Sequence, residues 1–198
     1  MLHPHMPQIP LGRSATYDDL VALPEHLVAE IVDGELWASP RPAPRHATAD
    51  QRLDAILVPE FERGGRGRGG WRLLGEPELH LGSHVVVPDI AGWRIERMPC
   101  LPDTAYFTVA PDWICEVLSP STARLDRDKK LRIYAEAGVA FAWLVDPLAR
   151  SLEVLKRADT ASGSASWTPL ATHVGGHAVQ AEPFEVVDIR LGWLWDEE

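Results

Sequence analysis

Two spacings of apolar residues divide the chain into expected helices and expected strands. Helical spacing predicts an amphipathic helix over about Ala47 to Glu62. The apolar residues that define it are Ala49, Leu53, Ile56, Leu57 and Phe61. The segment DRDKKLRIYAEA (126–137) also has a helical pattern, and Gly138 is placed to end that helix. A shorter helix is predicted from Tyr17 to Leu23, because Pro24 follows it.

Shorter runs, either apolar throughout or alternating, predict the strands. They are AEIVDGELWAS (29–39), WRLLGEPELHL (71–81), HVVVPDI (84–90), WICEVL (113–118), FAWLVDP (141–147) and SLEVLKR (151–157). Asp33-Gly34 divides the first run and predicts a hairpin. The order strand, helix, strand over 113–147 predicts a crossover unit, and 151–157 follows closely enough to pair antiparallel. DTASGSAS (159–166) predicts a hairpin tip, and the tail from WTPLATHV to LGWLW (167–195) is expected to add short edge strands.

These elements predict an α/β fold with a mixed central sheet flanked by helices, an additional N-terminal hairpin and C-terminal strands. A chain of 198 residues, 45% of them hydrophobic, is expected to form a single domain over 1–198. Residues 1–14 are expected to be a flexible or extended segment. No stretch has the pattern of a signal peptide or a membrane span, so we expect a cytoplasmic protein without a membrane partner.

The formal net charge of −10 counts against a nucleic-acid partner, because phosphate binding normally uses clustered Lys and Arg. It does not exclude one. An acidic site that binds a divalent metal changes its own local sign, and net charge does not describe how charge is distributed.

Two carboxylates in apolar surroundings are the main candidates for chemistry. Glu116 lies in the middle of WICEVL, where burying an ionised group is costly without a partner. Asp89 ends the apolar run VVVPDI, and Glu78 lies in the strand before it. Carboxylate oxygens suit Mg²⁺ or Mn²⁺, which activate water for attack on phosphorus. We therefore expect Asp89, Glu116 and Glu78 to bind Mg²⁺ or Mn²⁺ and to support hydrolysis of a phosphodiester.

A cation is available on the helix that follows Glu116. Lys130 could hold the attacking water or stabilise charge that develops on the phosphoryl oxygens. Each residue also has a structural interpretation: Glu116 could pair with a structural cation, Asp89 could start a turn, and Lys130 could be a solvated lysine. The combination of the three, rather than any one of them, favours catalysis.

Other polar residues are candidates for supporting roles. Glu30 could face the site, and His46 lies on the apolar side of its helix, although a structural histidine explains it as well. Arg63, Arg66 and Arg68, in the loop RGGRGRGG, could contact a nucleic-acid backbone, or the loop could be a solvated surface loop. No further cofactor-binding residues are predicted.

At this point the chain resembles the restriction endonucleases of the Uma type, within the PD-(D/E)XK nuclease superfamily. The resemblance runs in order through AEIVDGELWASP, His46, VVVPDI, ICEVLSPST, DRDKKLRIYAEAGV and FAWLVDP. It implies a restriction-endonuclease-like core, magnesium bound by Asp89 and Glu116, and DNA as the substrate. One feature departs from the superfamily pattern, because Leu118 stands where that pattern has a lysine.

The resemblance implies that the following helix supplies the missing lysine, and the spacing to Tyr134 favours Lys130 over Lys129. It also implies that Glu30, His46 and Glu78 lie near the site. The resulting hypothesis is a metal-dependent DNA endonuclease, which by analogy works as a homodimer. Two alternatives stay open: a catalytically silent interaction or dimerisation module with a nuclease fold, and a metal-dependent phosphohydrolase that acts on small substrates.

Overall fold

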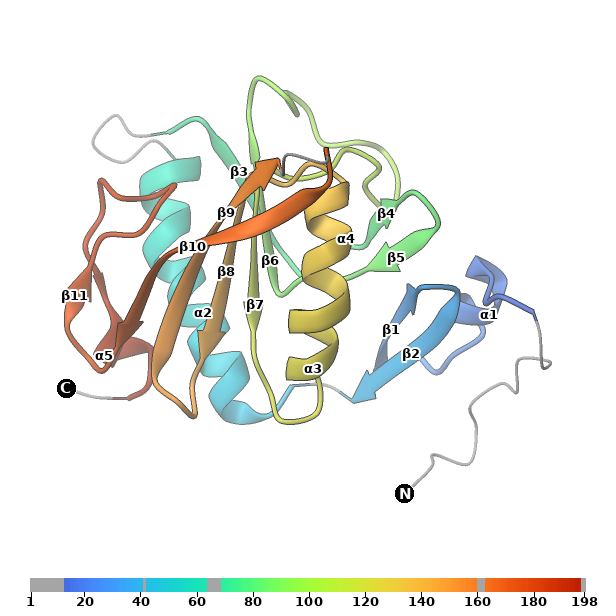
Figure 1. Cartoon of the computed structure of the whole chain (residues 1–198), viewed down its shortest axis with the longest axis horizontal. Coiled ribbons are helices and arrows are strands. Elements are labelled where there is room, and N and C mark those ends of the chain that lie inside the picture. The colour runs from blue at the N-terminus through green and yellow to red at the C-terminus, as the bar shows by residue number, and fades with distance from the viewer. Residues whose placement is uncertain (1–12, 41, 64–68, 160–162, 197–198) are drawn as a thin grey trace.

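The structure is a computed structural model that describes residues 13–40, 42–63, 69–159 and 163–196 (Figure 1). Its centre is a six-stranded mixed sheet in the order β10-β9-β8-β7-β6-β3. The strands are β3 (Trp71–Gly75), β6 (Ile90–Arg94), β7 (Trp113–Val117), β8 (Phe141–Asp146), β9 (Ser151–Asp159) and β10 (Ala165–Val174). β7 and β8 are parallel and all other neighbours are antiparallel, which confirms the crossover unit and the antiparallel strand after it.

Helices cover both faces of this sheet, as the predicted α/β class requires (Figure 1). One face packs against α2 (Pro44–Leu57) and the π-helical segment η1 (Val58–Glu62). The other packs against α3 (Ala123–Leu125), the π-helical segment η3 (Asp126–Lys130) and α4 (Leu131–Glu136). Because side chains alternate along a strand, Cys115 of β7 faces the α2 side and Ile114 faces the α4 side.

A second, four-stranded sheet lies beside the first in the order β2-β1-β5-β4. Its strands are β1 (Leu27–Val32), β2 (Glu35–Pro40), β4 (Leu79–Leu81) and β5 (His84–Val86), and α1 (Tyr17–Val21) packs against β1. The predicted hairpin is confirmed, and its turn residues Asp33 (φ 54°) and Gly34 (φ 75°) both adopt the left-handed conformation. The predicted helix over 17–23 is confirmed, although it ends at Val21.

Two predicted strands are each divided between the sheets. The run 71–81 was predicted as one strand, but it separates at Glu76-Pro77 into β3 of the large sheet and β4 of the small one. The run 84–90 likewise separates at Val87-Pro88-Asp89 into β5 and β6. Proline lacks the N–H that a central strand needs, which is the physical reason for both breaks. The breaks place Glu76 and Asp89 together where the chain crosses between sheets, since Glu76 N–H donates to the Asp89 carbonyl at 2.8 Å.

The C-terminal tail differs from its prediction. It was expected to add short edge strands, and β10 does lie at the edge of the large sheet, but β10 is ten residues long and 191–194 forms the short helix α5 (Leu191–Leu194). Leu191 and Leu194 are buried in the core while Trp193 is 42% exposed, which is a helical rather than an alternating pattern. The short strands β11 (Ala178–Val179) and β12 (Ile189–Arg190) form a separate pair.

The helix predicted over 47–62 is confirmed, but it begins three residues earlier, at Pro44. Proline is favoured at the first position of a helix, because no intrahelical partner is lost there. Among the helices of the described ranges, none is long and apolar enough to cross a membrane.

Candidate active site

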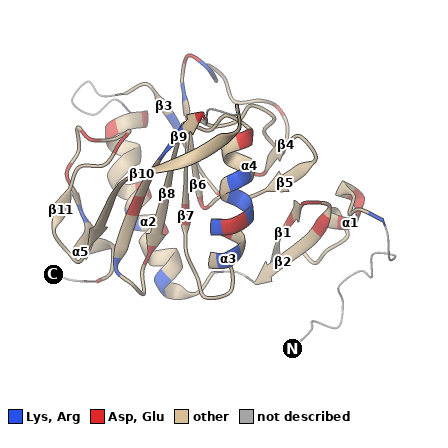
Figure 2. Cartoon of the chain, viewed as in Figure 1, with Lys and Arg blue, Asp and Glu red and all other residues tan. Residues whose placement is uncertain are grey.

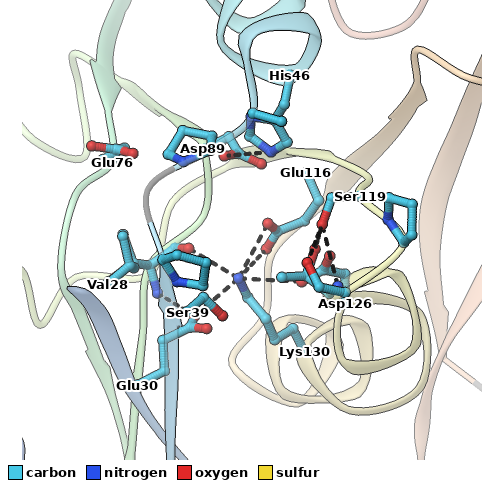
Figure 3. A pocket seen from close by; sticks show the side chains of 17 residues that line it. Val28, Glu30, Ser39, His46, Glu76, Asp89, Glu116, Ser119, Asp126 and Lys130 are labelled. Carbon is cyan, nitrogen blue, oxygen red and sulfur yellow. Dashed lines mark hydrogen bonds and ion pairs between the residues drawn. The ribbon is translucent and has the colours of Figure 1, made fainter. Parts of the chain in front are cut away.

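A cavity of about 350 Å³ opens where β7 ends, between the start of α2, the β1–β2 hairpin and α3 (Figure 3). The predicted residues Glu30, His46, Asp89, Glu116 and Lys130 all line it. The further lining residues with polar side chains are Ser39, Glu76, Ser119, Ser121, Thr122 and Asp126. Five separate segments of the sequence therefore meet at one point, as the hypothesis of a shared site requires.

Lys130 lies at the centre of this cavity (Figure 3). Its Nζ is 2.9 Å from Glu30 Oε1, 3.0 Å from Glu116 Oε1 and 2.9 Å from the carbonyl oxygen of Val87. Asp126, one helical turn earlier, is 3.5 Å away. The ammonium donates hydrogen bonds to the Val87 carbonyl and to Glu116 Oε2, the latter at 3.1 Å, and Glu30 adds an ion pair. Burial lowers the pKa of Lys130, but the charges of Glu116 and Glu30 outweigh that effect and hold the pKa well above its usual value.

Glu116 is almost fully buried, with 2% of its surface exposed, and is held from two sides. Besides Lys130, the hydroxyl of Tyr134 donates to Glu116 Oε1 at 2.6 Å. Burial raises the pKa of Glu116 well above its usual value, and although Lys130 opposes this, Asp126 and Asp89 add to it. One lysine thus faces more carboxylates than it can neutralise, and the cluster favours an additional proton or another cation.

Asp89 lies directly before β6 and beside the end of β7. Its Oδ2 accepts the N–H of Val117 at 2.6 Å, and its Oδ1 is 3.3 Å from His46 Nε2. In the antiparallel pairing of β6 with β7, Ile90 lies opposite Cys115. Asp89 and Glu116, one position further along each strand, therefore lie opposite each other. Burial lowers the pKa of His46, but the hydrogen bond to Asp89 and its charge outweigh this and raise the pKa above its ordinary value. His46 therefore binds a proton more readily than an ordinary histidine does, on the α2 side of the cavity.

The structure places the predicted ligand Glu78 away from these residues. It does not line the cavity, and its Oε1 accepts hydrogen bonds from Tyr17 at 2.9 Å and from His80 at 2.7 Å. Glu76 lines the cavity instead, on the same side as Asp89 (Figure 3). The cause is the strand break described above: the sequence pattern read 71–81 as one strand, whereas the turn at Glu76 (φ 47°) brings that residue to the junction of the sheets.

Arg63, one of the three arginines predicted to contact nucleic acid, does not line the cavity. Arg63 directly follows η1. The next strand, β3, begins beside Arg94 and ends at Gly75, which lies near Asp89 and the cavity. Arg63 therefore lies toward the opposite end of the sheet. Arg66 and Arg68 fall outside the described residues.

The two adjacent lysines have different surroundings, which supports the choice of Lys130 over Lys129. Lys129 is one-third exposed and pairs on the surface with Glu35 at 3.0 Å and with Asp33 at 3.5 Å. Figure 2 shows acidic and basic residues in alternation along the helix from α3 to α4, which is typical of a helix face exposed to solvent. Lys129 therefore links the β1–β2 hairpin to the helix by ion pairs at the surface, whereas the side chain of Lys130 lines the cavity.

Comparison with known proteins identifies the family. The Uma2 family model, described as "Putative restriction endonuclease", matches residues 15–194. The chain belongs to this family. Among solved structures, a crystal structure of a "putative nuclease belonging to DUF820" from Anabaena variabilis ATCC 29413 is similar, with a TM-score of 0.70 and 21% identity. The similarity covers 92% of this chain and 98% of that one, and it confirms the nuclease-like fold. No curated protein matches the chain.

The side chains of this Uma2 family member do not form a complete protein cage for Mg²⁺, but they fit an Mg²⁺ ion that also binds water and substrate. Within the described residues, no group of three or more His, Cys, Asp or Glu side chains is arranged to hold a metal ion. Mg²⁺, however, is commonly held by only one or two carboxylates, with waters and substrate phosphates completing its shell. Asp89 and Glu116, adjacent across β6 and β7 and facing one cavity, fit this second mode.

Several polar residues of the site were missed at the sequence level, and some had a detectable signal. Asp126 precedes Lys130 by four residues and so shares its helix face, which could have marked it. Tyr134 was noted only for its spacing, yet it holds Glu116. Asp50 and Asp54 follow His46 along the same face of α2, and burial raises their pKa values to about 7 and about 6. Glu76 gave no signal, because only the strand break brings it to the cavity.

Proposed function

We propose that this chain is a metal-dependent DNA endonuclease in which Asp89 and Glu116 hold Mg²⁺ or Mn²⁺ and Lys130 assists the attacking water. The observation that carries the proposal is the meeting of these three side chains in one cavity, from segments far apart in the sequence. Membership of a family described as restriction endonucleases supports DNA as the substrate. Bound there, the metal ion would supply an activated water and would stabilise negative charge on the phosphoryl oxygens.

The excess of carboxylates supports the cation. Glu30, Glu116 and Asp126 surround a single ammonium, and the pKa of Glu116 is raised well above its usual value, by burial first and then by nearby acids. A divalent cation beside Glu116 would offset this repulsion. Tyr134 keeps the Glu116 carboxylate in a fixed orientation, and His46 does the same for Asp89.

Three partners surround Lys130, and a water molecule would have to compete with them for its ammonium. The ammonium hydrogen-bonds Glu116 and the Val87 carbonyl and forms an ion pair with Glu30. The carbonyl is the neutral acceptor of the three and the cheapest to lose, because hydrogen bonds to charged groups are stronger. We therefore expect the donor that now faces Val87 to turn toward the attacking water.

The start of α2 offers a place for the phosphate. α2 begins beside the cavity and has no side-chain cap, so the backbone N–H groups of Arg45 and His46 lack an intrahelical partner. Such N–H groups and the helix dipole bind anions. The exposed side chain of Arg45 adds a positive charge there. This local arrangement offsets the unfavourable net charge of −10.

A plasmid-nicking assay with Mg²⁺ or Mn²⁺ tests the proposal. Asp89→Asn and Glu116→Gln should each lower the nicking rate by about 100-fold or more, because each removes a carboxylate ligand. Asp128→Asn is the matched control, since Asp128 forms a surface ion pair with Arg124 away from the cavity, and this substitution should leave the rate unchanged. Mn²⁺ should also raise the melting temperature of the wild type and not that of Asp89→Asn.

The outcomes separate the alternatives. A wild type that neither nicks plasmid nor gains thermal stability from Mn²⁺ would be a silent nuclease-fold module. Hydrolysis of a nucleoside triphosphate without cleavage of plasmid would point to a small-substrate phosphohydrolase. The homodimer stays a proposal by analogy, and light scattering of the purified chain tests it.

A further inference from the structure

A second cavity, of about 320 Å³, adjoins the proposed active site. Its wall is formed by α1, the loop after it and β1, and we call it the side slot. Val28, Glu76 and Val87 line both the side slot and the active-site cavity, so the two cavities are neighbours that share part of their walls. A polymeric substrate whose phosphate lies at Asp89 therefore has a neighbouring space within reach.

The lining of the side slot combines apolar and acidic side chains. Its apolar residues include Leu20, Leu23, Leu27, Val28, Ala29 and Val87. The charged residues that line it are Glu25, Glu76 and Glu78, and no Lys, Arg or His is found among its described lining residues. A phosphate would be repelled there. A flat ring that carries an N–H donor would be accepted, because the apolar side chains can contact a face of the ring and a carboxylate accepts the donor.

Glu78 is the acceptor with a fixed position. Tyr17 and His80 both bond its Oε1, at 2.9 Å and 2.7 Å, and this holds the carboxylate at the slot. His80 is itself fixed by stacking on Tyr106, with ring centroids 4.0 Å apart and planes 13° apart. Within the described residues Oε2 of Glu78 receives no hydrogen bond, and it remains available to a ligand.

We propose that the side slot binds a nucleobase of the DNA substrate through its exocyclic amino group, with Glu78 as the acceptor. The inference rests on the proposed function and adds to it a preference for bases that carry an exocyclic amino group. Cytosine has an amino donor at the ring position where uracil has a carbonyl oxygen, and a carboxylate attracts the first and repels the second. A base can enter the slot only if it is unstacked, so single-stranded DNA is the expected ligand.

Binding of single strands without metal tests the preference independently of catalysis. Fluorescence anisotropy would compare short oligomers of deoxycytidine and deoxyuridine, which differ in the group at this ring position. The wild type should bind the cytidine oligomer about tenfold more tightly. Glu78→Gln should reduce the difference to about twofold, because an amide offers both a donor and an acceptor. Glu185→Gln, at an exposed acid outside both cavities, is the matched control and should keep the tenfold difference.

A second variant guards against a folding defect in Glu78→Gln. Val21 lines the side slot and is 62% exposed, so Val21→Trp can narrow the slot without disturbing the core. It should weaken cytidine binding to the uridine level, while Leu148→Trp, at a residue 58% exposed elsewhere, should not. Equal wild-type binding of the two oligomers, or no binding of either, would overturn the inference. Plasmid nicking by the same preparation then shows whether the proposed function survives without it.

Discussion

Two groups of carboxylates lie on opposite faces of β7, and they are neutralised in different ways. On the α4 face, Glu116, Glu30 and Asp126 surround Lys130 within 3.5 Å. On the α2 face, Asp50 and Asp54 each have a buried oxygen without a hydrogen-bond partner among the described residues. Burial raises the pKa of Asp50 to about 7 and that of Asp54 to about 6. The first group shares one lysine, which opposes the rise in the pKa of Glu116, whereas burial of the second group favours the uptake of protons.

The difference shows what one lysine does for a group of buried acids. Lys130 favours the ionised form of Glu116 but does not fully offset its burial, since the pKa of Glu116 stays raised beside the lysine. Without such a lysine, acids in similar surroundings keep their protons to higher pH. Asp89 lies between the two groups, and its partners are a histidine and a backbone N–H rather than a lysine. This makes Asp89 the carboxylate most open to a metal ion.

Removing the lysine should have the largest effect. Lys130→Met leaves the buried Glu116 and Glu30 without a cation, and we expect the free energy of unfolding to fall by about 3–5 kcal/mol at pH 7.5. Urea denaturation measures this. The loss should be smaller at pH 5, where protonation of Glu116 removes its uncompensated charge, and smaller again in Lys130→Met/Glu116→Gln. A loss below about 1 kcal/mol in the single variant would mean that the lysine is not what compensates this group.

Neutralising an acid on the α2 face should raise the free energy of unfolding rather than lower it. The pKa of Asp50 is about 7 in the folded chain against an ordinary value of 3.8, so the folded state holds the proton more tightly. Its contribution to stability is present below about pH 4 and is lost as the pH rises through about 7. Asp50→Asn should therefore stabilise the chain by about 2 kcal/mol at pH 8 and hardly at all at pH 4.5. Urea denaturation at both pH values measures these gains in stability. Equal gains at the two pH values would contradict the prediction.

The hydroxyl of Tyr134 should contribute less than the lysine. Tyr134→Phe removes the donor to Glu116 Oε1 and keeps the packing of the ring, so the free energy of unfolding should fall by about 1–2 kcal/mol. Nicking activity should fall as well, because Glu116 loses its orientation. Tyr106→Phe provides the matched control for loss of a hydroxyl away from the cavity. Unchanged stability and nicking in Tyr134→Phe would remove this residue from the site.

The exposed neighbour of Lys130 should have the smallest effect. Lys129→Met breaks surface pairs with Asp33 and Glu35 and a cation–π contact with Trp37, and we expect a loss of less than about 1 kcal/mol. The loss should shrink further in high salt, which screens surface pairs. A loss equal to that of Lys130→Met would mean that burial does not distinguish the two lysines.

Much of the fold could be predicted because local rules decided it. Asp33-Gly34 specifies its hairpin turn, and the spacing of Leu53 and Leu57 specifies the buried side of α2. Predictions were wrong where one apolar run served two sheets, at 71–81 and 84–90, and where Leu191 and Leu194 formed a helix rather than a strand. These outcomes depend on which neighbours cover each side chain, and the residues alone do not contain that information.

The sequence by itself determined that a buried glutamate, an aspartate after a proline and a lysine-bearing helix were present, because each lies in a local pattern that makes its residue type costly or unusual. Only the tertiary structure decided that Glu116, Asp89 and Lys130 share one cavity and that Glu76 rather than Glu78 lies beside Asp89. It also decided that Lys130 is surrounded by Glu30, Glu116 and the Val87 carbonyl. The physical reason is that the energy of a buried charge depends on the distance to its partners. In this chain those partners come from strands and helices that are remote in sequence.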